Sequence, residues 1–542
     1  MKYMYLKIRL LIVTLVIFAV GCNDSFLEQK YVPEFPWQTI DQLEMAVILP
    51  YSTFTGHGWS DPSGVYTFYE MLATDIGTPI EEASPNNEWR QYLGRTHRSI
   101  AIEGLPWTNY VYETLYATVT GCNEPLDFLN SGDPAILFPQ ESEERANREV
   151  PRAKAELHFF RGYAYTWLAL YFCPPYVPGG ANSDQVIPLK TTNLNANNTP
   201  VGTTQEIWDQ VISDLKEAKS LMPNTWFKSG RLNYYTICGA LARAYFYTGD
   251  YANAEKECTE IISSGKFSLP SDVMATWTVP MGDADSPEAL WMYNTSASGA
   301  NNFTWTALSR ANAWGPPYGR GEDAQCSWNL IKLSNAMIKK INWMVDPENG
   351  DYTVTAEALA DKRYGNTWLR QECYKSKEDV RAEVELTGDQ SLWDKYDQMY
   401  KTQTTPFIFL DKYFRGVSTS QTNSPRMRLP EFYLMRAAVR FKNNDKNGAA
   451  SDVNVVRTRA GLPEITDAEI TENHIDREWV IELGGEGVYL SYLMAMQKPI
   501  LGGDRTGVAP VNPPYTGWYW KIPINEVRIN AGYINIVDPN SK

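Results

Sequence analysis

Residues 203–264 constrain the fold most strongly, because their apolar side chains recur at the spacing of packed helices. Residues 203–206 form a capping box, in which the Thr203 hydroxyl can accept from the third amide and Glu206 can reach back. Pro223 ends this first helix. The apolar positions that mark its buried face are Ile207, Trp208, Val211, Ile212, Leu215, Ala218 and Leu221.

The next stretch, residues 241–254, reads Leu-Ala-Arg-Ala-Tyr-Phe-Tyr-Thr-Gly-Asp-Tyr-Ala-Asn-Ala and resembles a tetratricopeptide signature. Leu241 and Tyr245 stand where one helix packs on the next, and residues 249–251 supply a turn. Ala254 is small, as expected where two helices cross closely. The pattern predicts a tetratricopeptide-like helix pair.

Weaker copies of this pattern flank it. They cover 107–129 with 149–172, 428–442 with 447–460, and a final long helix at 472–496. A single helix pair cannot bury its own apolar face, so the pairs should stack. We therefore expect a mainly α fold: a helix-pair superhelix with repeats over about 107–264 and 428–497.

Two long segments, about 51–106 and 265–425, have a different composition. The longer one is rich in Gly, Asn, Ser, Thr and Trp and shows few helical periods before about 325; the shorter one is similar. Loops of this length are usually functional or disordered, and the aromatic content argues against disorder. We expect both segments to be irregular and to form a ligand-binding face.

The first residues are typical of an export signal. Three basic residues (Lys2, Lys7 and Arg9) precede an apolar run of about eleven residues, too short to span a bilayer. Residues 19–22 then resemble a bacterial lipobox, although Ala19 stands where leucine is usual. This interpretation makes residues 1–21 a lipoprotein signal, Cys22 the lipidated first residue, and residues 22–542 one domain. An ordinary secretory signal is the alternative.

The charge balance excludes several partners. Removal of residues 1–21 leaves 46 basic and 64 acidic residues, a net charge of −18. Such a surface argues against nucleic-acid binding and against an electrostatic attachment to anionic lipid. Besides Cys22, six cysteines remain, with no CxxC pair. We interpret them as small core residues, with a disulfide left open.

Four short motifs together resemble the SusD/RagB family, the outer-membrane nutrient-binding lipoproteins of the Bacteroidetes. Residues 454–462 (Asn-Val-Val-Arg-Thr-Arg-Ala-Gly-Leu) resemble its N-x-V-R-x-R-A-G-L motif, and residues 428–434 the helix before it. Residues 522–530 resemble its closing I-P-x-x-E motif, and residues 22–28 its mature start.

The late helix of that family departs from its usual pattern here. Glu478, Glu482 and Glu486 match, but aromatic residues replace the expected Arg, Arg and Asp. These are Trp479, Tyr489 and Tyr492. We expect aromatic packing to take the place of a structural ion network.

The resemblance implies a non-enzymatic, lipid-anchored protein facing the cell exterior. It also implies that an oligosaccharide ligand passes into a SusC-like, TonB-dependent outer-membrane barrel. Two other functions stay open: a tetratricopeptide-type scaffold that binds only protein, and uptake of peptide or glycoprotein-derived cargo.

Two aromatic clusters in the irregular segments have the chemistry for sugar binding. Rings cover the C–H face of a sugar, while amide and guanidinium groups bind its hydroxyls. The candidate ligand residues are Trp89, Arg90 and Tyr92 in the first cluster, and Asn301, Asn302, Trp305, Trp314 and Tyr318 in the second. The alternative is that each tryptophan fills the core.

No cofactor is expected. Asp283 and Asp285 offer carboxylates for structural calcium, but the rest of an EF-hand loop is missing, which favours a solvated turn. Only four histidines exist, and HExxH, GxSxG and P-loop motifs are all absent from the sequence. A glycosidase needs only two carboxylates, which 64 acidic residues could supply. We nevertheless expect no catalysis.

Overall fold

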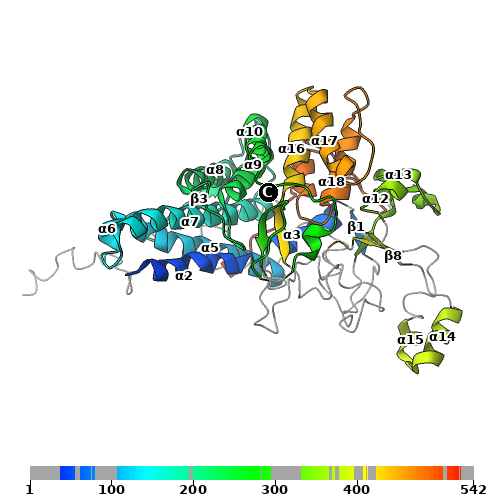
Figure 1. Ribbon diagram of the computed structural model, residues 1–542, viewed down its shortest axis with the longest axis horizontal. Helices are drawn as coiled ribbons and strands as arrows, with labels where there is room; N and C mark the ends of the chain where they lie inside the picture. The colour runs from blue at the N-terminus through cyan, green and yellow to red at the C-terminus, as the bar shows by residue number, and fades with distance from the viewer. Residues whose placement is uncertain are drawn as a thin grey trace, which may run out of the picture.

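The computed structural model is mainly helical, with a few short strand pairs (Figure 1). It describes residues 37–54, 62–74, 76–79, 106–194, 199–280, 282–294, 331–364, 369–372, 377–395, 407–410, 412, 423–504, 509–523 and 525–526. Among them, no helix is both long enough and apolar enough to cross a bilayer.

The helical layer is a continuous series of neighbours in space. α5 (Pro106–Leu129) packs on α7 (Glu143–Phe172), α7 on α8 (Thr204–Leu221), and α8 on α9 (Tyr234–Tyr247). The sequence signals hold at both ends of α8, since Thr203 and Glu206 form the capping box and the helix ends before Pro223. Stacked helix pairs were expected, and the mainly α fold is confirmed.

The tetratricopeptide-like turn lies between α9 and α10 (Tyr251–Ser263). Gly249 has φ +79°, which a residue with a side chain adopts only with strain. Asp250 then caps α10 through the amide of Asn253, 3.2 Å away. Gly239 of α9 allows a close approach, because a Cβ there would lie 2.3 Å from the sulfur of Met427.

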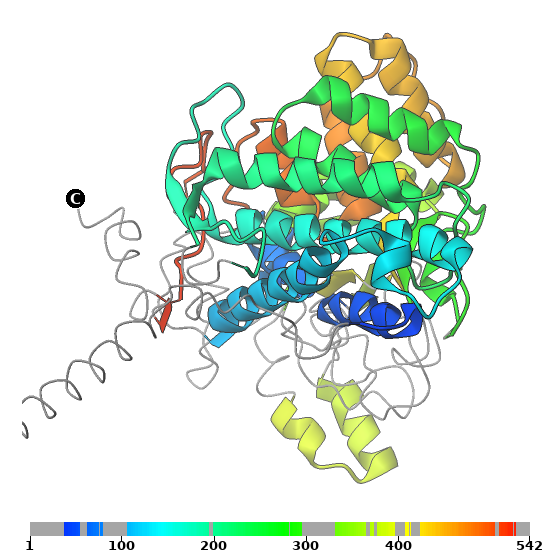
Figure 2. The ribbon, with the colours of Figure 1, turned by 90° about the vertical axis from the view of Figure 1, so that its left-hand side faces the viewer.

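The series continues through α16 (Leu429–Lys442), which lies against α10, α17 (Lys446–Arg459) and α18 (Glu472–Leu483) (Figure 2). The prediction of one long helix over 472–496 is wrong. It stops at Leu483, and α19 (Tyr489–Ala495) follows as a separate helix. Two glycines between them, Gly485 and Gly487, have φ +80° and +77°, which α-helix does not permit.

The N-terminal helices are tied to both ends of this series. α2 (Ile40–Thr53) packs on α5 and α7. α3 (Pro62–Ala73) lies within the first segment that was expected to be irregular, so that segment is partly helical. α3 docks on α19, where the hydroxyls of Tyr66 and Ser491 lie 3.2 Å apart.

The remaining elements are short. They are β1 (Gly77–Pro79), α6 (Pro134–Leu137), β2 (Gln185–Pro188), β3 (Val201–Thr203), η3 (Ala275–Thr278), β4 (Ala289–Tyr293), β5 (Ile331–Leu333), α12 (Asn335–Lys340), β6 (Met344–Asp346), η4 (Pro347–Asn349), β7 (Asp351–Val354), α13 (Ala356–Ala360), β8 (Leu369–Glu372), α14 (Lys377–Thr387), α15 (Ser391–Lys395), β9 (Phe407–Leu410) and β10 (Ser424–Arg428). The strands form antiparallel pairs: β1 with β5, β2 with β3, β4 with β10, β6 with β7, and β8 with β9.

One large core contains most of the buried aromatic side chains. Trp520, close to the C-terminus, packs on Tyr69, Tyr171 and Phe172 with centroid distances of 5.6, 4.7 and 6.4 Å. The cysteines within the described residues (Cys122, Cys173, Cys238 and Cys258) are buried and free. They fill the core, as interpreted from the sequence.

Candidate functional site: the junction of the irregular segments and its ion network

The candidate ligand residues of both clusters, and the lipidation candidate Cys22, lie outside the described residues. These candidates are Trp89, Arg90, Tyr92, Asn301, Asn302, Trp305, Trp314 and Tyr318. The structure does describe the residues between which they stand in the chain. Pro79 ends β1 and Ile331 begins β5, and these two residues are directly paired in the strand ladder.

This pairing joins the two irregular segments to each other. Trp89 is ten residues after Pro79, and Tyr318 is thirteen residues before Ile331. Asn301, at the far end of the second cluster, is thirty residues before Ile331. β5 also contacts β9, which pairs with β8, so four strands from distant parts of the sequence meet here.

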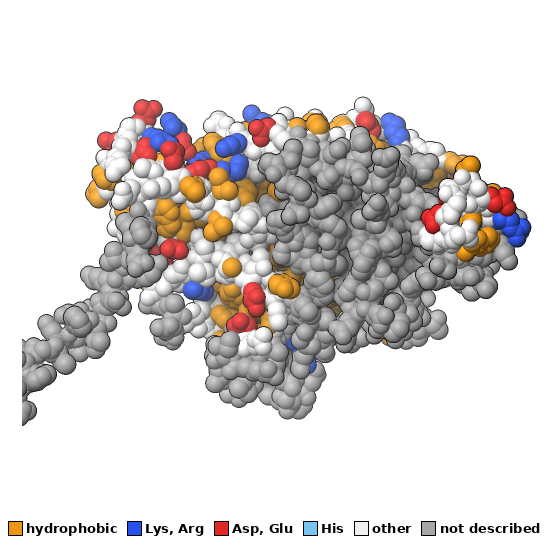
Figure 3. All heavy atoms as spheres, turned by 90° about the horizontal axis from the view of Figure 1, so that it is seen from below, with side chains coloured by type: hydrophobic (Ala, Val, Ile, Leu, Met, Phe, Trp, Pro, Cys, Tyr) orange, Lys and Arg blue, Asp and Glu red, His pale blue; other side chains and the backbone are white. Residues whose placement is uncertain are grey.

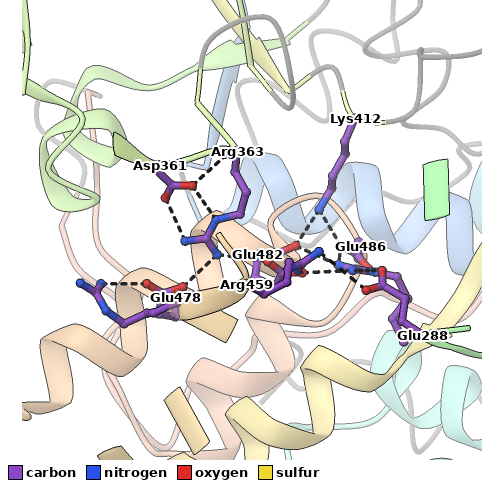
Figure 4. A network of polar contacts seen from close by, with 10 residues as sticks. Glu288, Asp361, Arg363, Lys412, Arg459, Glu478, Glu482 and Glu486 are labelled. Carbon is purple, nitrogen blue, oxygen red and sulfur yellow. Dashed lines mark hydrogen bonds and ion pairs between the residues drawn. The ribbon is translucent and has the colours of Figure 1, made fainter. Parts of the chain in front are cut away.

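A buried ion network lies where α18 meets the middle of the chain (Figure 4). Glu482 of α18 is fully buried and stands at its centre. One of its carboxylate oxygens accepts from Arg428, at 3.1 Å, and from Arg459; the other accepts from Arg363 at 3.1 Å. A carboxylate with three arginines around it is fully hydrogen-bonded, which its burial requires.

Arg363 connects this centre to the short elements after β7. Its guanidinium donates to both oxygens of Asp361, at 3.0 and 2.9 Å, and to Glu478 at 2.9 Å. Glu478 also accepts from Arg457 of α17, at 3.1 Å. The network therefore holds residues 361–363 against α17 and α18.

The break between α18 and α19 is the other end of the network. Glu486, in the break, accepts from Arg428 at 2.6 and 2.9 Å and from Lys412 at 2.6 Å. Lys412 and Arg428 each also donate to the backbone carbonyl of Glu482, at 3.0 Å. Arg428 further donates to Glu288, just before β4, at 2.8 Å.

Among the described residues, the contacts given above join five cations to five anions, and Arg457 also lies 3.4 Å from Glu357 at the edge of the network. Its cations are Arg363, Lys412, Arg428, Arg457 and Arg459, and its anions are Glu288, Asp361, Glu478, Glu482 and Glu486. Burial alone would raise the pKa of Glu482, but the surrounding arginines outweigh it and hold that pKa far below the ordinary value. Burial lowers the pKa of Lys412 to about 8, against the opposing effect of Glu486.

The motifs that resemble the SusD/RagB family thus have a structural role in this chain. Arg457 and Arg459 of the 454–462 motif, and Arg428 of the 428–434 motif, bind the matched glutamates of the late helix. Their partners from the middle of the chain were missed, because Asp361, Arg363 and Lys412 lie in short elements without periodicity.

The expected aromatic packing is present, but it stands beside the ion network and does not take its place. Trp479 and Tyr492 stack with centroids 4.4 Å apart and planes 15° apart. Phe246 of α9 lies parallel to Trp479 at 6.4 Å, and Tyr489 follows Tyr492 at 6.0 Å. The stack ties α9 to α18 and α19.

A small cavity of about 50 Å³ adjoins the network between α3, α7, α9 and β10. Its walls include Glu486, Tyr247 and the buried pair Arg243–Glu431, whose two hydrogen bonds are both 2.6 Å long. Such a volume admits a few water molecules.

Glu70 of α3 is a buried acid that faces α19. One of its carboxylate oxygens accepts from the amide of Leu490 at 3.0 Å, whereas the other has no hydrogen-bond partner among the described residues. Burial raises the pKa of Glu70 to about 8, although backbone amides of α19 oppose the rise. The folded protein therefore keeps this carboxyl protonated near neutral pH.

This protonation predicts a pH dependence of stability. Because the folded pKa exceeds the unfolded value, the stabilisation is complete below about pH 4.5 and is lost as pH rises through about 8. Glu70→Gln keeps the shape and cannot ionise. Urea unfolding should therefore show a difference between wild type and variant that shifts in favour of the variant from pH 5 to 8. A constant difference would contradict a protonated Glu70.

Residues that could suggest metal or acid–base chemistry have other partners. Cys238, Glu257 and Glu260 come within 4.8 Å of one another, but Lys219 donates to both glutamates at 2.7 Å. Asp283 and Asp285 are exposed and lie outside that group. His158, interpreted as a satisfied core histidine, lies 3.0 Å from Asp214.

Comparisons with known proteins agree on one family. The model of the SusD family matches residues 287–492, and the model described as "Starch-binding associating with outer membrane" matches residues 67–246. Proteins of this kind bind carbohydrate at the outer membrane. No curated protein matches the chain.

Solved structures share the fold. A SusD superfamily protein from Bacteroides thetaiotaomicron is 18% identical, with 91% of this chain and 98% of that chain covered and a TM-score of 0.64. A SusD-like carbohydrate binding protein from Bacteroides vulgatus is 15% identical, with 93% and 100% covered and a TM-score of 0.67. A SusD superfamily protein from Parabacteroides distasonis is 17% identical, with 91% and 97% covered and a TM-score of 0.61.

The motifs, the helix-pair architecture and the two matched models lead to the same conclusion, that this chain belongs to the SusD/RagB family.

Proposed function

We propose that this protein is a lipid-anchored surface receptor that binds an oligosaccharide and delivers it to a SusC-like, TonB-dependent outer-membrane barrel. Its ligand residues are the two aromatic clusters, around Trp89 and around Trp305. It carries out no catalysis of its own and is attached to the outer membrane through Cys22, with its bulk outside the cell.

The observation that carries this proposal is the pairing of Pro79 with Ile331. It ties the segments that hold the two clusters to one junction, which the buried network fastens to the helical layer. A ligand site works best on segments held by a rigid frame. A scaffold that binds only protein has no need of two ring-bearing segments joined in this way.

The experiment is calorimetric titration of the soluble domain, without Cys22, against a panel of oligosaccharides. Trp89→Ala and Trp305→Ala should each weaken binding of the recognised sugar about tenfold or more, because each lost stacking surface contributes roughly 1–2 kcal/mol. Phe227→Ala is the matched control: this ring is 46% exposed and lies outside both clusters, so its loss should leave affinity unchanged.

Different results would favour different functions. If only one of the two substitutions weakens sugar binding, the ligand site is assigned to the cluster that contains that residue. Failure to bind any sugar, combined with tight binding of a peptide, would change the cargo to peptide or glycoprotein. Failure to bind either, with co-purification of a protein other than a barrel, would favour the tetratricopeptide-type scaffold.

The barrel partner has its own test. The full-length protein should co-purify from detergent-solubilised outer membrane with a TonB-dependent barrel in a defined ratio. Cys22→Ala should release the protein from the membrane fraction. A full-length protein that fractionates with the cytosol would contradict both the anchor and the delivery role.

A further inference from the structure

The outward side of α2 carries three exposed apolar side chains. Met45, Ile48 and Leu49 are 74%, 48% and 62% exposed, and their spacing places them on one side of the helix. We call these three residues the α2 stripe. In the view from below, hydrophobic side chains lie exposed on the part of the surface formed by the N-terminal helices (Figure 3).

The second half of α2 is apolar on both sides. Leu43, Val47 and Tyr51 are buried on the side toward α5 and α7. Residues 45–53 contain no charged side chain. A helix that is apolar all round is normally enclosed by apolar surroundings, and here α5 and α7 enclose only one side.

The position of α2 in the chain suggests what covers the other side. The described chain begins at Trp37, fifteen residues after Cys22. Fifteen extended residues span at most about 50 Å, and a flexible segment of that length spans about 20–25 Å on average. An acylated Cys22 would therefore keep α2 close to the membrane surface.

We propose that the α2 stripe contacts the outer-leaflet lipid into which the acyl chains of Cys22 are inserted, and that this contact sets the orientation of the protein on the membrane. The inference rests on the lipid anchor of the proposed function. Three apolar side chains without an aromatic ring on a convex helix fit a lipid surface better than a protein partner, because the hot spots of protein interfaces are enriched in Trp, Tyr and Arg seated in pockets and poor in Leu.

The stripe acts only together with the anchor. A single acyl chain already holds a protein marginally, and three side chains bury less apolar surface than that. The net charge of −18 for residues 22–542 gives no electrostatic attraction to anionic lipid. The soluble domain without Cys22 should therefore not bind vesicles.

The test uses the lipidated full chain in vesicles of phosphatidylethanolamine and phosphatidylglycerol. Cys326 and Cys373 are changed to Ser, and an environment-sensitive fluorophore is attached through Leu49→Cys. Ser220→Cys, exposed on α8, is the matched control. Fluorescence at position 49 should rise at least threefold and be quenched by spin-labelled lipid, whereas position 220 should show neither change. Far-UV circular dichroism checks that each labelled variant is folded.

Three results would overturn the inference. Vesicle-bound protein with water-like fluorescence at position 49 would show that the anchor holds while the stripe stays in solvent. A rise at position 49 that requires an added barrel protein would assign the stripe to a protein contact. Protein that stays in the supernatant would remove the anchor, and with it this membrane contact, while leaving sugar binding by the soluble domain untouched.

Discussion

Glu482→Gln is expected to lower the free energy of unfolding by about 3–5 kcal/mol, the usual cost of leaving a buried charge without its partner. The change keeps the shape of the side chain but removes the charge that three buried arginines share. Arg363, Arg428 and Arg459 would then face one another with one carboxylate fewer. Urea unfolding followed by far-UV circular dichroism measures the loss.

The control for this change is Glu464→Gln, at an exposed position in the loop after α17. It should alter stability by no more than about 0.5 kcal/mol. An equally small effect of Glu482→Gln would mean that the network adds nothing to stability. A large loss shared by both variants would point to overall charge as the cause.

Trp479→Ala is expected to cost about 3–5 kcal/mol, as for other fully buried aromatic side chains. The side chain is 1% exposed and contacts the rings of both Phe246 and Tyr492, so its removal leaves a cavity and breaks two ring contacts. The effect should appear as a lower midpoint in thermal unfolding.

Trp479→Phe separates packing from ring stacking at this position. It keeps a ring in contact with Phe246 and Tyr492 and should recover at least half of the loss. If Trp479→Phe were as unstable as Trp479→Ala, the indole shape itself would be required and not the stack. Phe227→Ala, already used as a binding control, should be close to wild type in stability.

Local patterns in the sequence predicted the helices well. Two of these patterns depend only on neighbouring residues and are found as expected: the capping box of Thr203 and Glu206, and the turn at Gly249. The break after Leu483 was missed because apolar positions continue in helical phase on both sides of it. The local signal was the cluster Gly484, Gly485 and Gly487, and the positive φ values of the last two show that the helix cannot continue.

The ion network was not predicted, because the aromatic residues of the late helix led us to expect ring packing in its place. The family motifs mark Arg428 just before α16 and charges on α17 and α18, whereas Arg363 and Lys412 stand more than fifty residues from the glutamates they bind. No local rule links such residues. The eight ligand candidates of the two clusters stay predictions, because they depend on the aromatic content of segments outside the described residues.

The docking of α3 on α19 has a consequence for the order in which the chain matures. Tyr66 and Ser491 are 425 positions apart, and Glu70 meets Leu490 across a similar separation. At about 5–20 residues per second, a ribosome needs roughly 20–85 s to make the intervening chain. During that time Tyr66, 1% exposed in the finished fold, lacks its contact with Ser491 of α19. The N-terminal helices can therefore complete their packing only after almost the whole chain has been synthesised.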